Sequence, residues 1–307
     1  MQPMTAVKPK LVSLLSNWYS GATLFTILLN RHSQIVSNGE TMFFNDEDAS
    51  RYDCSCGKYI DECDFYEATT RHMRRPGVPG WDKRLFVQVP TLSRNPILRS
   101  LLGSPRFESV LRHRIISAVP AWGGLRDRFL EAQLQFFANA RQLAHASIYL
   151  DGTKSIPRAQ LFARSGASDM KVLHLLRDGR GFSASCVRHM DSKPSLTEAA
   201  KIWMDYISAV DKFAKSFPSV PVLSVRYEDL CRNTVATVDR ICGFLEIPSE
   251  DLTVGTMDGM HVLGNRMRRN FNGAIVEDTS WKERLDPATQ THLTSLMRKQ
   301  LERFGYL

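Results

Sequence analysis

Residues 171–185 read Lys-Val-Leu-His-Leu-Leu-Arg-Asp-Gly-Arg-Gly-Phe-Ser-Ala-Ser and predict a strand, a tight turn and a helix in succession. Val172–Leu176 is a short apolar run, as expected for a strand that is buried on both faces of a parallel sheet. Asp178-Gly179 is a turn signal, and Gly181–His189 predicts the helix. Such a unit binds anions, because the first N–H groups of the helix are unpaired and lie at the positive end of its dipole.

The polar side chains of this stretch fit a phosphate monoester. Arg177 falls at the carboxyl end of the predicted strand, where open α/β sheets bind their ligands. Ser183 and Ser185 add two hydroxyls on the helix. Taken alone, the stretch also fits an ordinary strand-to-helix connection with a surface arginine.

A second apolar run, Lys10–Ser16, precedes Asn17-Trp-Tyr-Ser-Gly-Ala-Thr-Leu-Phe25 and again predicts a strand, a glycine-containing loop and a helix. The loop is similar to a P-loop but lacks the Gly-Lys-Ser/Thr ending. The lysine that holds nucleoside triphosphate phosphates and the hydroxyl that binds magnesium are therefore not in their usual places.

Three motifs, in this order along the chain, resemble those of the sulfotransferases that use 3′-phosphoadenosine 5′-phosphosulfate (PAPS). Ser20-Gly-Ala-Thr23 resembles the Ser-Gly-Thr-Thr loop of that family. Arg177, with Ser185 eight positions later, is similar to its 3′-phosphate motif, and Val225-Arg-Tyr-Glu-Asp-Leu230 to its later signature. The segment from His261 to Trp281 is similar to carbohydrate-type and bacterial members. The resemblance implies a P-loop-like, three-layer α/β fold with a parallel sheet.

The resemblance also implies which residues bind PAPS, which would serve as cosubstrate with no metal required. The loop would hold the 5′-phosphosulfate through backbone N–H groups and hydroxyls, and its residues are Tyr19, Ser20, Gly21, Ala22 and Thr23. Gly21 allows close backbone approach. A helix N-cap at Ser20 or Thr23 is compatible with this role.

The remaining cosubstrate contacts come from later motifs. By resemblance, Arg177 and Ser185 bind the 3′-phosphate, and Tyr227 lies near the adenine. Arg266 and Arg268 are candidates in a C-terminal 3′-phosphate loop. A packed tyrosine at a strand end is the structural alternative for Tyr227.

Glu40 and Lys154 are the catalytic candidates. Gly39-Glu40-Thr41 follows a predicted strand, as a Gly-Glu-Thr does in tyrosylprotein sulfotransferases, where that glutamate is the base. Lys154 resembles the family's lysine beside the bridging oxygen, and Ile156 stands where cytosolic relatives have a histidine, which favours the glutamate base. A helix-capping acid and a solvent-exposed lysine are the structural alternatives.

One position departs from the family pattern. Tyr19 stands where the family's loop usually carries Arg or Lys immediately before Ser-Gly. A cation expected at the sulfuryl group is thus missing from the loop, and Lys154 is the candidate that would supply it.

Composition and charge narrow the class of protein. The chain has 307 residues, 43% of them hydrophobic, and a formal net charge of +8, which favours anionic partners. No basic stripe interleaved with aromatic residues and no zinc-finger or RNA-recognition signature is present, so we expect no nucleic-acid partner. No apolar run has the length of a signal peptide or of a membrane span, so we expect a soluble, cytoplasmic protein.

Three of the six cysteines, Cys54, Cys56 and Cys63, form a cluster in the sequence. A structural loop is the favoured interpretation, since similar Cys-x-Cys-Gly segments occur in bacterial sulfotransferase-like proteins. Two alternatives stay open: a zinc site with a fourth ligand such as His72, although the spacing fits no standard zinc module, and a redox pair, which a reducing cytosol disfavours.

Strands and helices alternate along a single predicted domain, residues 1–307. Strands are expected at 11–16, 34–38, 147–151, 172–176 and 220–225, and helices at 23–31, 125–145, 157–164, 181–189, 196–217, 228–245 and 287–304. Residues 45–124 are too long for a plain loop and predict a mostly helical insertion over the acceptor site.

The expected function is transfer of a sulfuryl group from PAPS to a hydroxyl of a small molecule, glycan or lipid. A non-catalytic nucleotide-binding protein on the same fold is the first alternative, motivated by Tyr19. A P-loop kinase or other nucleotide hydrolase is the second, and the missing Gly-Lys-Ser/Thr ending disfavours it.

Overall fold

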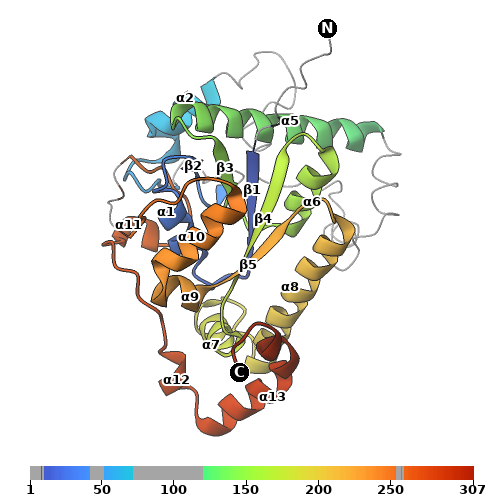
Figure 1. Cartoon of the computed structure of the whole chain (residues 1–307), viewed down its shortest axis with the longest axis vertical. Helices are drawn as coiled ribbons and strands as arrows, with labels where there is room; N and C mark the ends of the chain where they lie inside the picture. Colours follow the sequence, from blue (N-terminus) through green and yellow to red (C-terminus); the bar gives the residue numbers. More distant parts are fainter. Residues whose placement is uncertain (1–7, 9, 42–51, 72–119, 254–256, 258) are drawn as a thin grey trace.

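A five-stranded parallel sheet with the strand order β2-β3-β1-β4-β5 forms the centre of the computed structural model (Figure 1). The structure describes residues 8, 10–41, 52–71, 120–253, 257 and 259–307. The strands are β1 (Lys10–Ser16), β2 (Ile35–Val36), β3 (Ile148–Asp151), β4 (Asp169–Leu176) and β5 (Val222–Arg226). The parallel α/β architecture predicted from the sequence is therefore confirmed.

The helices that the structure describes alternate with these strands. They are α1 (Ala22–Leu29), the 3₁₀-helix η3 (Ile60–Glu62), α2 (Asp64–Arg71), α5 (Pro120–Leu143), α6 (Ile156–Ser165), α7 (Gly179–His189), α8 (Leu196–Ser216), α9 (Tyr227–Arg232), α10 (Thr234–Leu245), α11 (Met267–Asn270), α12 (Trp281–Arg284) and α13 (Pro287–Arg303). Within this part of the chain, none of the helices combines the length and the apolar composition that crossing a bilayer requires.

The central strand β1 is buried on both faces, and its side chains alternate between two separate cores. Leu11 and Leu15 pack with side chains of α5, α6 and α8 on one face. Val12 and Leu14 pack with side chains of α1 and α10 on the other. Because a strand directs successive side chains to opposite faces, this run of apolar residues specifies a sheet covered by helices on both sides.

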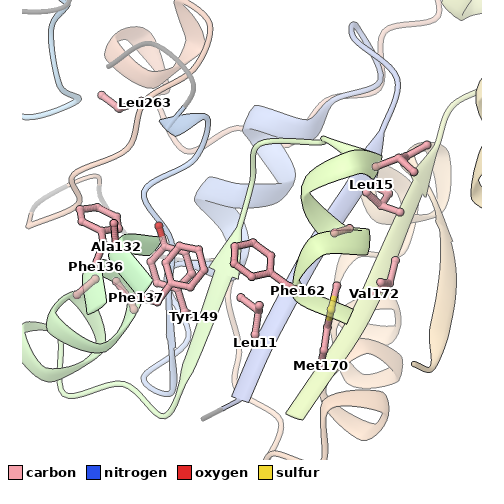
Figure 2. Close-up of a cluster of buried hydrophobic side chains, with 14 of the residues drawn as sticks. Leu11, Leu15, Ala132, Phe136, Phe137, Tyr149, Phe162, Met170, Val172 and Leu263 are labelled. Atoms are coloured by element: carbon pink, nitrogen blue, oxygen red, sulfur yellow. The ribbon is translucent and has the colours of Figure 1, made fainter. Parts of the chain in front are cut away.

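Aromatic residues of α5 fill part of the first of these cores. Phe137 stacks on Tyr149 of β3, with ring centroids 4.0 Å apart, and its ring centroid lies 5.4 Å from that of Phe162 on α6 (Figure 2). Phe136 lies edge-on to Tyr149. Together these rings fix α5 and α6 against the same face of the sheet.

The structure corrects one predicted element and shortens another. The helix predicted over 228–245 is two helices, because Asn233 leaves the helical conformation at φ −132° and ψ 56°. Asparagine favours such breaks, since its side chain competes for backbone hydrogen bonds. The strand predicted over 34–38 is reduced to Ile35–Val36.

Of the predicted insertion at 45–124, the structure describes 52–71 and the first residues of α5. The described part holds η3 and α2. The remainder, and with it His72, lies outside the described residues.

Candidate functional site

The loops that carry the predicted site residues leave the carboxyl ends of neighbouring strands. Glu40 follows β2, Lys154 follows β3, the 17–21 loop follows β1, Arg177 follows β4 and Tyr227 follows β5. Because all five strands are parallel, these ends lie along one edge of the sheet. The helix after β1, α1, and the helix after β4, α7, pack into different hydrophobic clusters. A crevice is therefore expected between the loop after β1 and the loop after β4.

The loop after β1 has the backbone geometry of an anion cradle. Tyr19 has φ 58° and Gly21 has φ 83°, both in the left-handed region. Gly21 precedes α1 without a side-chain cap, so the first N–H groups of that helix face the loop. Ser20 and Thr23 are buried beside it. Successive N–H groups in such turns form concavities that bind phosphate groups.

The guanidinium of Arg177 connects the β4 end to this loop. It donates to the carbonyl of Tyr19 at 3.0 Å and to the hydroxyl of Ser185 at 3.2 Å. The indole N–H of Trp203 donates to the Arg177 carbonyl at 3.0 Å, which holds the backbone in place. The structure thus brings together the two residues expected at the 3′-phosphate.

An acidic residue that the sequence analysis did not single out also faces Arg177. Asp278 accepts from Arg177 Nη2 with its carboxylate at 2.9 Å and with its carbonyl at 3.0 Å. Partial burial acts to raise the pKa of Asp278, but hydrogen bonds from Ser280 and Arg177 lower it to about 2. An ionised carboxylate therefore lies where an anionic ligand would approach Arg177.

The ring of Tyr227 packs against the loop after β1. A Cβ atom added at Gly21 would lie 2.5 Å from its ring, so only glycine fits there. The hydroxyl of Tyr227 donates to the Val276 carbonyl at 3.2 Å and accepts from the Asp278 N–H at 3.0 Å. Burial raises the pKa of Tyr227 well above its ordinary value, so the phenol stays neutral. The residue joins the loop to the 276–278 segment.

Glu40 and Lys154 form an ion pair at the ends of adjacent strands. Lys154 Nζ lies 2.6 Å from Glu40 Oε1, and the side chains are 8% and 16% exposed respectively. Lys154 has φ 61°, an uncommon conformation for a residue with a side chain. The two residues proposed for catalysis therefore meet in a largely water-excluded position.

Close backbone contact between the two loops makes this pair possible. A Cβ atom at Gly152 would lie 2.9 Å from the Gly39 carbonyl oxygen. Asp151 then accepts from the Thr153 N–H at 3.2 Å and from the buried Arg158 at 2.7 Å, which fixes the turn before Lys154.

Tyr206 of α8 connects the β3 end to β1. Its hydroxyl donates to the Lys154 carbonyl at 3.0 Å and accepts from the Ser16 N–H at 2.8 Å. The helical spacing of Tyr206 predicts only a core position, and nothing in the sequence signals this bridge.

The side chain of Tyr19 points toward α7 and α8. It packs against their apolar cluster, and its ring centroid lies 5.7 Å from that of His189. Burial, with the nearby Cys186 and Asp191, raises the pKa of Tyr19. The residue therefore contributes its backbone carbonyl to Arg177 while its side chain serves packing.

The two C-terminal arginine candidates have different surroundings. Arg268 is buried and donates to the Asp53 carboxylate at 2.9 Å, to the Asp53 carbonyl at 3.1 Å and to the Gly264 carbonyl at 2.5 Å. Arg266 is exposed at the start of α11. Arg268 holds its own loop in place, whereas Arg266 is the one open to solvent.

The cysteine cluster gathers around His261. The Sγ atoms of Cys54, Cys56 and Cys63 and a ring nitrogen of His261 all lie within 4.8 Å of one another. A hydrogen bond with Cys54, helped by His261 and opposed by burial, lowers the pKa of the Cys63 thiol to about 3. The same contact raises the pKa of Cys54. These residues could hold a metal ion.

A cavity of about 390 Å³ lies elsewhere, beyond the carboxyl end of α1. Asn30, His32 and Met260 are among its lining residues, and neither Arg177, Lys154 nor the 17–21 loop lines it. The hydrogen-bond geometry, and not this cavity, therefore locates the candidate site.

Comparison with known proteins finds one family model that matches part of the chain. The model described as "Sulfotransferase family" matches residues 159–251, a segment that contains Arg177, Ser185 and Tyr227. No curated protein sequence matches the chain.

Two solved structures share the fold. The sulfotransferase domain from the curacin biosynthetic pathway is 15% identical with a TM-score of 0.52, covering 96% of this chain and 98% of that one. The sulfotransferase domain from the Synechococcus PCC 7002 olefin synthase is 16% identical with a TM-score of 0.51, covering 96% of each chain.

Proposed function

We propose that this sulfotransferase-family chain is an enzyme that transfers the sulfuryl group of PAPS to a hydroxyl of a small molecule, glycan or lipid. The observation that carries the proposal is the ion pair between Glu40 and Lys154, 2.6 Å apart at the sheet edge that also holds the β1 loop. It joins a carboxylate and a cation beside an anion cradle, as this transfer requires.

The proposed chemistry places each group at a specific step. The acceptor oxygen attacks sulfur while the bond between sulfur and the bridging phosphate oxygen breaks, and adenosine 3′,5′-bisphosphate leaves. Glu40 takes the hydroxyl proton of the acceptor. The Lys154 ammonium has three N–H donors, so one can stay on Glu40 while another stabilises the charge that develops on the bridging oxygen. The transition state is loose by analogy with phosphoryl transfer, so positioning and charge stabilisation dominate.

The cosubstrate contacts follow the geometry at β1, β4 and β5. The 5′-phosphosulfate would lie on the N–H groups at the start of α1, beside Ser20, Ala22 and Thr23. The 3′-phosphate would replace or join Asp278 at the Arg177 guanidinium, which already donates to Ser185 at 3.2 Å. Tyr227, packed on Gly21, would lie near the adenine, and Arg266 is the better placed of the two C-terminal arginines.

The proposal also covers the cellular location of the protein and the class of its acceptor. The proposed location is the cytoplasm, whose reducing environment keeps cysteines from forming disulfides. The proposed acceptor is a hydroxyl compound and not a nucleic acid.

Two measurements test the proposal. Calorimetry should show that adenosine 3′,5′-bisphosphate binds the chain and that ATP with magnesium does not bind at that site. Radiolabelled PAPS incubated with extracts should then yield labelled acceptor. Binding without any transfer would favour the alternative of a non-catalytic nucleotide-binding protein. Two observations support that alternative: the ionised Asp278 lies beside Arg177, and the loop after β1 lacks the usual cation. Binding of ATP with magnesium alone would contradict both the proposal and this alternative.

A further inference from the structure

Three cysteines and one histidine, distant in the sequence, converge outside the candidate active site. Cys63 Sγ lies 3.2 Å from His261 Nδ1, and Cys54 Sγ lies 3.6 Å from the same nitrogen. Cys56 Sγ lies 3.7 Å from Cys63 Sγ. Each residue therefore directs a potential ligand atom to one common point.

The distances suit a tetrahedral zinc site. With Zn–S bonds of about 2.3 Å and Zn–N bonds of about 2.0–2.1 Å, the edges of the tetrahedron are about 3.8 Å between sulfurs and about 3.6 Å between sulfur and nitrogen. Two of the separations, 3.7 Å between sulfurs and 3.6 Å between sulfur and nitrogen, match these edges, the third, 3.2 Å, is about 0.4 Å shorter than its edge, and all four ligand atoms lie within 4.8 Å of one another. Three thiolates and one imidazole also form a donor set that selects zinc over magnesium, calcium or manganese.

Neither a disulfide nor apolar packing explains the arrangement of the three cysteines and His261 as well as a zinc site does. A disulfide needs an S–S distance of about 2.05 Å, whereas none of the three cysteines forms a disulfide and the Sγ atoms of Cys56 and Cys63 lie 3.7 Å apart. Apolar packing would explain buried Cys54 and Cys63, but not the exposed Cys56 turned toward the same point.

The local fold presents the first two cysteines from a tight turn. The Cys54 N–H donates to the Lys58 carbonyl at 2.9 Å, and the Gly57 N–H donates to the Cys54 carbonyl at 3.0 Å. Gly57 has φ 86° with open space around it, so the turn closes without steric conflict. Cys63 then follows η3 directly, where the chain turns back toward the same point.

His261 is held in position from the other side. The Phe65 ring stacks on its imidazole, with centroids 4.7 Å apart. The His261 carbonyl accepts from Asn38 Nδ2 at 2.9 Å and from the Tyr66 hydroxyl at 3.0 Å. The imidazole is thus oriented with Nδ1 toward the sulfurs by contacts that do not involve a metal.

We infer that Cys54, Cys56, Cys63 and His261 bind one structural zinc ion, through three thiolates and the Nδ1 atom of the imidazole. The site is closed, since all four positions are protein ligands, and so it serves structure and not catalysis. The exposed Cys56 gives the metal a route of entry. This assignment replaces the metal-free loop expected from the sequence, and His261 takes the place considered for His72.

The site would hold the strand end that carries Glu40. Ser55, between two of the ligands, accepts from the Val262 N–H at 2.9 Å and donates to the Met260 carbonyl at 2.7 Å. Leu263, two residues after His261, then accepts from the Glu40 N–H at 3.0 Å. A zinc ion that joins 54–63 to His261 therefore fixes the segment on which the Glu40 backbone rests.

Metal analysis of the full chain tests the inference without any assay of activity. Protein purified under reducing conditions without chelator should contain one zinc per chain. Cobalt exchanged into the site should show the visible d–d bands of tetrahedral Co²⁺ and thiolate-to-cobalt charge-transfer bands in the near ultraviolet. Absence of bound metal together with absence of these bands after cobalt addition would overturn the assignment, as would a disulfide among the three cysteines detected by mass spectrometry.

Matched variants locate the metal. Cys56→Ser removes the most exposed ligand. Loss of a residue that only hydrogen-bonds to a metal ligand weakens metal binding by up to about 100-fold, so loss of a ligand itself should weaken zinc binding by more than that. Cys231→Ser, at a half-buried cysteine outside the cluster, should keep the full zinc content. Equal zinc content in both variants would exclude the cluster as the site.

If Cys56→Ser fails to fold, titration of the unmodified chain with a chelator takes the place of that variant. Unchanged near-ultraviolet circular dichroism after complete zinc removal would contradict a structural role of the metal.

Discussion

Lys154 Nζ and Glu40 Oε1 lie 2.6 Å apart, although 114 residues separate the two positions along the chain. They meet because β2 and β3 are neighbouring parallel strands whose loops touch at Gly39 and Gly152. The pair places a proton acceptor and a cation within one hydrogen bond of each other. Replacing either Lys154 or Glu40 is therefore the most direct test of the proposed transfer.

Replacing Lys154 should abolish transfer. In the proposed step, the ammonium stabilises negative charge on the bridging oxygen, and loss of one such donor costs about 10²–10³ in turnover. Lys154→Ala should therefore reduce kcat by at least about 100-fold, measured with labelled PAPS and a fixed acceptor.

Tyr19→Phe is the matched control for Lys154. The ring of Tyr19 packs against α7 and α8, so loss of its hydroxyl should reduce kcat by less than about tenfold, well short of the loss expected for a missing charged donor. Tyr19→Arg should not fully rescue Lys154→Ala, because the two side chains come from different loops. A loss in Tyr19→Phe as large as that in Lys154→Ala would show that the tyrosine itself takes part in the chemistry.

Replacing Glu40 should separate binding from turnover. Glu40→Gln keeps the shape and the hydrogen bond to Lys154 but cannot accept a proton. We expect kcat to fall about 10²–10⁴-fold, the range for loss of a general base. Affinity for adenosine 3′,5′-bisphosphate should stay unchanged by calorimetry. A kcat within a few-fold of the unmodified chain would assign the base to another residue.

Much of this arrangement follows from local sequence. The apolar runs at Lys10–Ser16 and Val172–Leu176 predict buried parallel strands, and in such a sheet the following loops must share one edge. Glu40, Lys154 and Arg177 are therefore expected at the same edge from the sequence alone. The distances between their side chains do not follow from the sequence, because they depend on how the loops pack.

The contacts that the sequence did not predict are long-range ones. Asp278 faces Arg177 across 101 residues, and His261 faces Cys63 across 198. Neither pairing leaves a periodic or spacing signal, since each depends on how the fold brings residue 261 or 278 back to a partner far away in the chain. The cysteine spacing signalled a possible metal site but could not indicate a ligand so distant in the chain.

Removing Arg177 should weaken binding of adenosine 3′,5′-bisphosphate. Loss of a hydrogen bond to a charged group costs about 1.5–3 kcal/mol, so Arg177→Ala should raise Kd by roughly 10- to 160-fold at 25 °C. Calorimetry measures this directly, and circular dichroism checks that the variant folds. An unchanged Kd in a folded variant would remove Arg177 from the 3′-phosphate site.

Neutralising Asp278 should have the opposite effect. Its carboxylate accepts from Arg177 at 2.9 Å and would repel an incoming phosphate. Because the carboxylate is 48% exposed, solvent screens the interaction, and we expect a gain of about 0.2–1 kcal/mol in bisphosphate binding for Asp278→Asn. Weaker binding in this variant would show instead that Asp278 positions the arginine for its ligand.

The last prediction concerns acid stability and the buried His174 of β4. Desolvation by burial lowers the pKa of His174 from 6.5 to about 4, with Asp211 opposing and Arg303 adding to the shift. Among the described residues, its Nε2 atom has no hydrogen-bond partner.

Burial of a neutral histidine makes stability depend on pH in one direction. Between pH 6.5 and 4 the unfolded chain binds a proton at His174 that the native chain excludes. The free energy of unfolding contributed by this group is therefore fully present above pH 6.5 and is lost as pH falls toward 4, by at most about 3–4 kcal/mol. Urea denaturation at a series of pH values should show this fall in the free energy of unfolding, and His174→Asn should flatten it.

His145→Asn, at an exposed histidine with φ 53°, is the control and should keep the pH dependence of the unmodified chain. Identical slopes in His174→Asn and the unmodified chain would mean that other groups govern the acid transition.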